Sequence, residues 1–109
     1  MSSLGQNSRR ILVYDYDVVL LITRCMVLRH AGFHVDSASS AEQFQERIAQ
    51  AETPYRLLLL GHTVPDPDQA RMAVSVANST TLVFQTRELV PPTQLIDDVR
   101  LLFHERRKS

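Results

Sequence analysis

Two unbroken runs of apolar residues constrain the fold of this chain more than any other feature. They are Ile11–Tyr14 and Leu57–Leu60. Neither run alternates apolar with polar residues. The first predicts a strand buried on both faces, as in a parallel sheet, and the second predicts another strand. With two shorter β-prone segments, the expected strands are Arg10–Asp15, Phe33–Ser37, Tyr55–Leu60 and Thr81–Gln85. At 109 residues, the chain suits a single domain.

Two helices are predicted in the first half of the chain. The first begins at Asp17 or the next residue and ends at His30 or Ala31, where Gly32 stops it. The second runs from Ala41 to about Ala51. Before it, Ser40-Ala41-Glu42-Gln43 has the spacing of a capping box, in which each end residue satisfies a backbone donor of the other.

Two further helices are predicted in the second half. The third runs to about Val76, with Asp66 or Asp68 as its cap. The last follows Pro91 and Pro92, and its apolar stripe consists of Leu95, Ile96, Val99, Leu102 and Phe103. Strands that alternate with helices favour an α/β fold, here a three-layer sandwich around a parallel sheet.

Composition narrows the functional classes. Twelve basic and twelve acidic residues cancel, so no overall field favours nucleic acid or a membrane surface. Val18–Ile22, the longest apolar stretch, is too short to span a bilayer. A single cysteine excludes an internal disulfide and fits the reducing cytoplasm. We therefore expect a cytoplasmic protein without specific nucleic-acid binding.

Several short segments match one known family in order and spacing. They are Arg10–Asp17, Ala31–Val35, Ala38–Glu42, and Leu57–Leu60 with Val64–Asp66. Together they resemble the CheY-like receiver domain of bacterial two-component response regulators. The resemblance covers residues 9–106, between a polar tail at 1–8 and a basic tail at 107–109. It implies a flavodoxin-like parallel sheet and a role in phosphorelay signalling.

The resemblance also locates a degenerate phosphorylation pocket. In a receiver domain, two acids after the first strand and an acceptor aspartate after the third hold Mg²⁺, and the acceptor attacks phosphorus. Asp15 matches the first acid, whereas Tyr16 replaces the second and Gly61 replaces the acceptor. Glycine has no side chain that could act as a nucleophile. We expect the Tyr16 ring to cover the vacated space.

The later elements of the pocket match a receiver domain only in part. Thr86 matches the switch hydroxyl, unless a shift of one residue puts Gln85 there instead. Val90 or Pro91 stands where a receiver has its lysine. Only Arg87–Val90 separates this region from the final helix, and a crossover between parallel strands needs a dozen or more residues. The fourth helix and fifth strand of a receiver are therefore expected to be shortened or missing.

Two hypotheses about function follow. In the first, the chain is a stand-alone pseudo-receiver that signals by protein–protein contacts without aspartyl phosphorylation, is not an enzyme and uses no cofactor. In the alternative, it is a small metal- or ligand-binding domain whose acidic edge contains Asp15, Asp17 and His62, residue types that ligate divalent metals.

The first predicted helix carries more apolar residues than one buried face requires. Val18–Ile22 and Cys25–Leu28 are both apolar. Loss of the fourth helix would uncover further apolar surface, which a small monomer rarely leaves in water. We therefore expect a homodimer or a complex with a partner protein.

Overall fold

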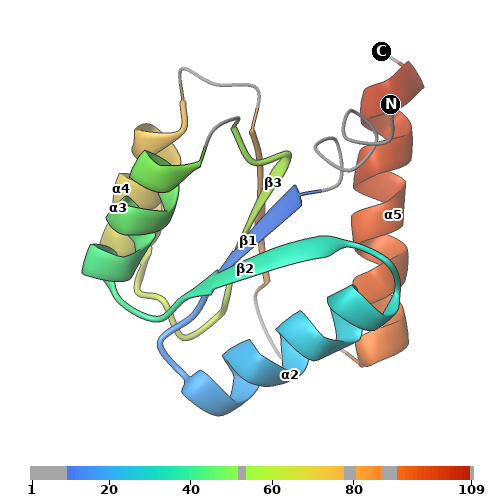
Figure 1. Cartoon of the computed structure of the whole chain (residues 1–109), viewed down its shortest axis with the longest axis horizontal. Helices are drawn as coiled ribbons and strands as arrows, with labels where there is room; N and C mark the ends of the chain where they lie inside the picture. The colour runs from blue at the N-terminus through green and yellow to red at the C-terminus, as the bar shows by residue number, and fades with distance from the viewer. Residues whose placement is uncertain (1–9, 52–53, 78–80, 87–90, 109) are drawn as a thin grey trace.

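A computed structural model describes residues 10–51, 54–77, 81–86 and 91–108. It contains a parallel sheet of four strands in the order β2-β1-β3-β4. The strands are β1 (Arg10–Tyr14), β2 (His34–Ala38), β3 (Leu57–Leu60) and β4 (Leu82–Gln85). Helices α2 (Val18–His30) and α5 (Pro92–Lys108) cover one face, and α3 (Ala41–Gln50) and α4 (Asp66–Ser75) cover the other (Figure 1). The predicted flavodoxin-like sandwich is confirmed.

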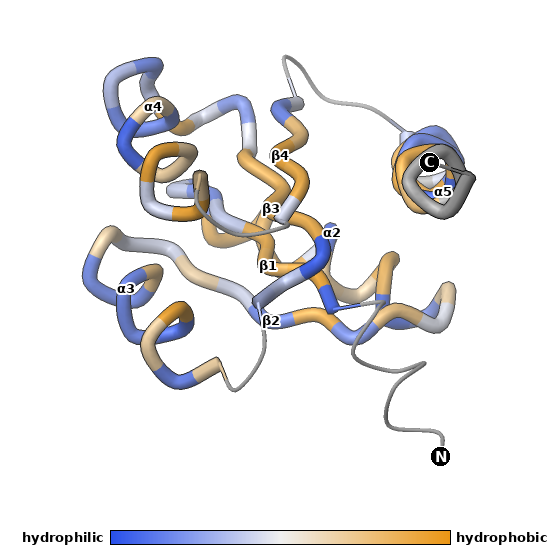
Figure 2. Tube along the Cα trace, turned by 90° about the horizontal axis from the view of Figure 1, so that it is seen from above, coloured by the Kyte–Doolittle hydropathy of each residue, from blue (hydrophilic) through white to orange (hydrophobic). Residues whose placement is uncertain are grey.

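The two apolar runs form the centre of the sheet, where Figure 2 shows the hydrophobic segments gathered. All four residues of β3 are buried. Leu57 and Leu59 belong to the core under α2 and α5, whereas Leu58 and Leu60 belong to the core under α3 and α4. Each fully buried leucine side chain contributes roughly 1.5–3 kcal/mol to folding relative to an exposed one. Removal of both faces from water therefore explains why this strand does not alternate.

The ends of the first two helices follow the sequence prediction closely. The Asp17 side chain caps α2 by accepting a hydrogen bond from Leu20 N at 3.1 Å. Gly32 follows α2 with a φ of 101°, a conformation that other residues rarely adopt. Ser40 Oγ accepts from Gln43 N at 3.1 Å, but Gln43 Oε1 accepts from Ser39 rather than from Ser40. The predicted capping box is thus formed in part: the bond from Gln43 N to Ser40 is present, and the Gln43 side chain accepts from Ser39, one residue before the predicted partner.

The start of α4 differs from the prediction. Its N-cap is Pro65, which makes no side-chain capping bond, and Asp66 is already the first helical residue. Asp66 and Asp68 lie in the first turn, where their charges favour the positive end of the helix dipole. They therefore act through charge and not as the cap.

α5 carries its apolar stripe to the sheet. Leu95, Val99 and Phe103 are buried in the core, and Leu102 packs against it. Ile96 is only half-buried and lies outside this cluster, which corrects the predicted stripe by one residue. Among the residues that the structure describes, no helix separates β4 from α5 and no fifth strand joins the sheet; residues 87–90 lie outside that description.

α2 is apolar on both its buried and its outer face. Its inner face buries Leu21, Arg24, Cys25 and Leu28. Val18, Val19, Ile22 and Met26 on the outer face are between 53% and 73% exposed. Within the described ranges, no helix combines the length and hydrophobicity needed to cross a bilayer.

Candidate functional site

The candidate site lies at the carboxyl end of the three strands β1, β3 and β4. Tyr14 pairs with Leu60, and Leu60 pairs with Gln85. The residues after these, Asp15, Gly61 and Thr86, follow the same register. Gly61 N donates to Tyr14 O at 2.8 Å, and Thr86 N donates to Leu60 O at 2.9 Å. The sheet therefore brings together three positions that are far apart in sequence.

Asp15 is fully buried, and both of its carboxylate oxygens are engaged. Oδ2 accepts from Arg24 Nη1 at 2.5 Å. Oδ1 accepts from the Thr63 hydroxyl and from Asp17 N, the latter at 3.1 Å. A buried carboxylate is tolerated only when its charge is paired and hydrogen-bonded in this way. The site thus satisfies Asp15 with groups of the protein itself.

Arg24 supplies the positive charge of the site, and sequence reasoning did not identify it. Its side chain is 6% exposed, and Nη2 lies 3.4 Å from His62 Nδ1. The signal was available, because Arg24 is the one charged residue on the buried face of α2, between Leu21 and Leu28. A charge on that face needs a buried partner, and the acid at the end of β1 is in reach. The guanidinium offsets the charge of the buried Asp15 carboxylate.

Gly61 is required here by lack of space. Its φ is not in the left-handed region, so its backbone would suit other residues. A Cβ atom would overlap the Asp15 carboxylate and lie 2.8 Å from Arg24 Nη1. The volume beside Gly61 is therefore filled by the Asp15–Arg24 ion pair.

Tyr16 does not fill that volume, contrary to the sequence prediction. Its ring packs edge-on against Tyr14, with ring centroids 5.4 Å apart. Its hydroxyl donates to Asp68 Oδ2 of α4 at 2.6 Å and accepts from Tyr14 at 3.0 Å. Partial burial and the hydrogen bond to Asp68 raise the pKa of Tyr16, while the same bond, together with Arg71, lowers the pKa of Asp68. Tyr16 therefore links the end of β1 to α4.

The three weak metal-ligand candidates each have another role. Asp15 pairs with Arg24, Asp17 caps α2, and His62 faces the Arg24 guanidinium. Among the described residues, no group of three or more His, Cys, Asp or Glu side chains could hold a metal ion. A metal at Asp15 would also meet the positive charge of Arg24.

Comparison with known proteins adds the fold relationship. No family model and no curated protein matches the chain. Among solved structures, it is similar to a response regulator receiver domain protein (CheY-like) from Methanospirillum hungatei JF-1, with a TM-score of 0.67. The match covers 92% of this chain and 97% of that one at 18% sequence identity. This chain has the fold of a receiver domain.

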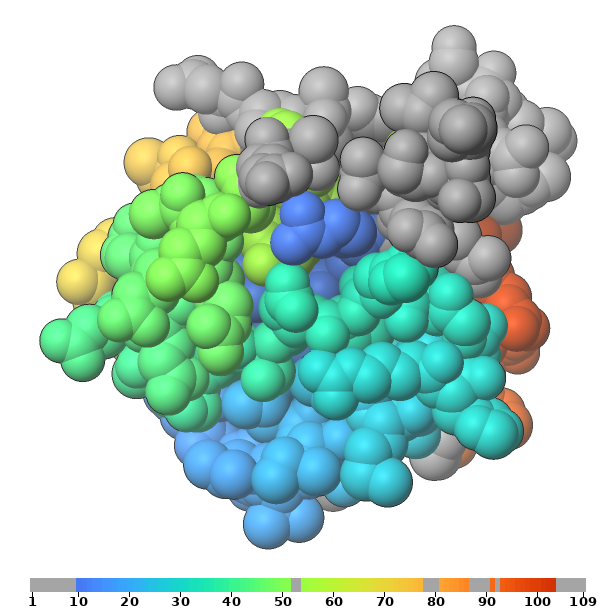
Figure 3. Space-filling model, viewed as in Figure 1, coloured from blue at the N-terminus to red at the C-terminus, as the bar shows by residue number. Residues whose placement is uncertain are grey.

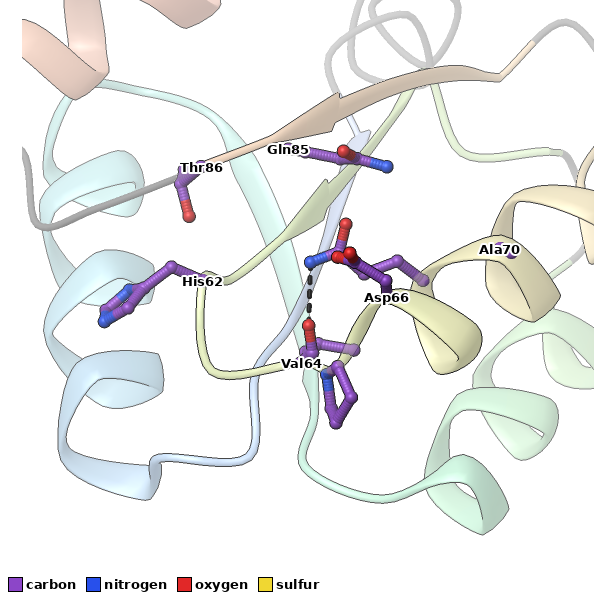
Figure 4. Close-up of a pocket in the computed structure, with 8 residues that line it drawn as sticks. His62, Val64, Asp66, Ala70, Gln85 and Thr86 are labelled. Carbon is purple, nitrogen blue, oxygen red and sulfur yellow. Dashed lines mark hydrogen bonds between the residues drawn. The ribbon is translucent and has the colours of Figure 1, made fainter.

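The two residues that the sequence offers for the switch position, Thr86 and Gln85, differ in burial and contacts. Thr86 is buried, and its hydroxyl donates to Leu60 O at 3.2 Å, whereas Gln85 is exposed. In Figure 4 the Thr86 hydroxyl points toward the loop that carries His62. Both residues border an open hollow of about 750 Å³ lined by His62, Val64, Pro65, Asp66, Gln69, Ala70, Gln85 and Thr86. The loop on one side of the hollow is held in place by a buried hydrogen bond, in which Gln69 Nε2 donates to Val64 O at 2.8 Å.

Proposed function

We propose that this chain is a signalling module with a receiver fold that acts by protein–protein contacts without aspartyl phosphorylation. One observation carries the proposal: the Asp15–Arg24 ion pair occupies the space beside Gly61. Phosphoryl transfer to a receiver needs a carboxylate nucleophile and a metal ion that neutralises the transferring group. Gly61 provides no nucleophile, and an arginine already neutralises the remaining acid.

The buried ion pair also favours a single conformation at this site over a switch between two conformations. Receiver signalling requires a charge change that biases a two-state element. Here both partners are almost completely buried, with the Asp15 side chain 0% exposed. Separating them would leave an uncompensated buried charge, which costs about 3–5 kcal/mol. We infer that the module presents the same surface to its partner at all times. We also propose that it acts in the cytoplasm and catalyses no reaction of its own.

The alternative, a metal-binding domain at the acidic edge, receives less support. Its central ligand would be Asp15, whose two oxygens already accept three hydrogen bonds. Mg²⁺ held by one or two carboxylates generally depends on further oxygen ligands from water or substrate phosphates. Recruiting Asp15 would require Arg24 to leave.

Incubation with acetyl phosphate and Mg²⁺ is expected to leave the intact mass of the protein unchanged. The physical reason is the absence of a carboxylate at Gly61 together with the neutralisation of Asp15 by Arg24. Intact-mass spectrometry provides the measurement, with a phosphorylatable receiver domain as the positive control.

A stable adduct of one phosphoryl group on the segment from Gly61 to Asp66 would contradict the proposal. Thermal melting with and without Mg²⁺ or Mn²⁺ tests the metal-binding alternative, because a ligand that binds only the folded state raises the melting temperature. No rise is expected; a clear rise would favour the metal-binding hypothesis.

The outer face of α2 supports self-association, and we infer that a second copy of the chain is the first candidate partner. Val18, Val19, Ile22 and Met26 form an exposed apolar patch on α2. Contiguous apolar patches on soluble proteins commonly mark interaction sites. An interface of this kind depends on removal of apolar surface from water and not on ion pairs.

Sedimentation velocity at low salt and at 1 M salt is therefore expected to give the same dimer content. Screening at 1 M shortens the range of exposed charge interactions to about 3 Å but leaves apolar burial in place. Met26→Glu should shift the protein to monomer, while Gln45→Glu on the exposed side of α3 serves as a charge-matched control. A wild-type monomer in both buffers would exclude the homodimer and leave only a heterologous partner.

A further inference from the structure

A second hollow, which shares no residue with the Asp15–Arg24 site, lies at the outer edge of β2. Its volume is about 300 Å³, and it is lined by Arg10, Arg29, Asp36, Ser37, Arg47, Gln50, Ala51 and Tyr55. In the space-filling view of Figure 3, the start of β1 (blue) lies in a recess between α3 (green) and β2 (teal). Three arginines from three different elements thus face one small volume.

Two of these arginines are oriented by the sheet edge. Arg29 Nη2 donates to Val35 O at 2.8 Å, and its Nε donates to the same carbonyl at 3.3 Å. Arg47 Nε donates to Ser37 O at 2.9 Å. β2 is an edge strand, so these contacts cover carbonyl groups that no neighbouring strand pairs. Within the described part of the chain, both terminal nitrogens of Arg47 and Nη1 of Arg29 remain available as donors.

The third arginine is oriented by an aromatic ring. The Arg10 guanidinium lies 4.6 Å from the centroid of the Tyr55 ring and 3.3 Å from Asp36 Oδ2. Tyr55 donates its hydroxyl to the same carboxylate oxygen at 2.7 Å. Burial and the Asp36 hydrogen bond raise the pKa of Tyr55 to about 12, so the phenol remains a donor at neutral pH. Asp36 is therefore already shared by two groups.

The charges of the hollow do not cancel. Three arginines and one aspartate leave a net charge of +2, although the chain as a whole has a formal net charge of 0. Covering the β2 carbonyls explains the Nε contacts of Arg29 and Arg47. The need to cover these carbonyl groups does not explain why the Arg10 guanidinium lines the same small hollow. A dianion would offset this excess charge.

We propose that this hollow binds a dianionic phosphate group, free or as the monoester of a small molecule. Guanidinium groups match phosphate oxygens through paired, charge-assisted hydrogen bonds, and guanidinium groups held in place lose little freedom on binding. A volume of about 300 Å³ lies at the lower end of the range for small-molecule sites. The hollow thus suits a small phosphorylated ligand and adds a binding activity independent of the altered receiver site.

The test is a titration of the full chain with inorganic phosphate and, separately, with glycerol 3-phosphate. Binding is followed by the Nε–Hε NMR signals of the arginines and by the melting temperature. We expect saturable shifts at Arg29 and Arg47, and affinity at least about tenfold weaker in Arg47→Gln, since one set of charge-assisted bonds contributes at least that factor. Arg100→Gln, the same change on the exposed side of α5, should bind as the wild type does.

Several outcomes would overturn the proposal. They are equal binding by Arg47→Gln and the wild type, an equal response to sodium chloride of the same ionic strength, and tighter binding of citrate than of either phosphate. If Arg47→Gln does not fold, Arg10→Gln is measured in its place with the same expectation. Tighter binding of glycerol 3-phosphate would assign the site to phosphate monoesters, and equal binding would assign it to free phosphate.

Discussion

Replacing Gly61 with aspartate is expected to lower the free energy of unfolding by about 3–5 kcal/mol and not to create a phosphate acceptor. Any Cβ atom at this position overlaps the Asp15 carboxylate, and Arg24 Nη1 is 2.8 Å away. The new carboxylate would also stand next to the buried charge of Asp15, and like charges in such a site disfavour each other. Denaturant unfolding measures the loss of stability, and intact mass after treatment with acetyl phosphate and Mg²⁺ measures phosphorylation.

Gly61→Ala separates the two causes, because it adds the Cβ atom without the charge. It is expected to cost about 1–3 kcal/mol, in the range of other overpacked cores. The difference between the alanine and aspartate variants then gives the effect of the second carboxylate. A Gly61→Asp protein that is as stable as the wild type and gains a phosphoryl group would show that the site has room for the acceptor after all.

Breaking the buried ion pair is the second change with a large expected effect. Arg24→Met leaves Asp15 buried without its counter-charge, and Asp15→Asn leaves the guanidinium unpaired. Each single substitution is expected to cost about 3–5 kcal/mol, the usual loss when one partner of a buried pair is removed. Urea denaturation of the three proteins gives these values directly.

The double variant Asp15→Asn/Arg24→Met completes a thermodynamic cycle. It should be more stable than the sum of the single losses predicts, by about 1–3 kcal/mol, since neither charge is then left unpaired. Arg71→Met is the matched control: Arg71 pairs with Asp68 on α4, but its side chain is 72% exposed. That loss should be much smaller than either loss at the buried pair, because solvent screens an exposed ion pair. Additive losses at Asp15 and Arg24 would mean that the pair does not hold the site together.

These two predictions have a common physical basis. A Mg²⁺ or Ca²⁺ site needs carboxylate oxygens that are free to ligate the cation. Here Thr63 and Arg24 donate hydrogen bonds directly to the Asp15 carboxylate. Gly61, Arg24 and Asp15 therefore depend on one another for space and charge, and a carboxylate at position 61 is expected to disturb the other two.

The strands and most helix ends were predictable from the sequence because they depend on local patterns. The unbroken runs at Ile11–Tyr14 and Leu57–Leu60 became the buried central strands β1 and β3. Asp17 and Gly32 act at the two ends of α2, as their types predict. Backbone hydrogen bonding and the spacing of apolar residues act over a few positions, so one sequence is enough to read them.

The interior of the candidate site was decided by tertiary structure. The sequence shows that Gly61 has no nucleophile, but only the fold shows that the Asp15–Arg24 pair fills the volume beside it. In the same way, only the fold turns Tyr16 toward Asp68 and brings Arg10, Arg29 and Arg47 around one hollow. Such pairings depend on the distances between separate elements and on the free volume that their packing leaves. Neither the distances nor the free volume can be read from residue type or from spacing along the chain.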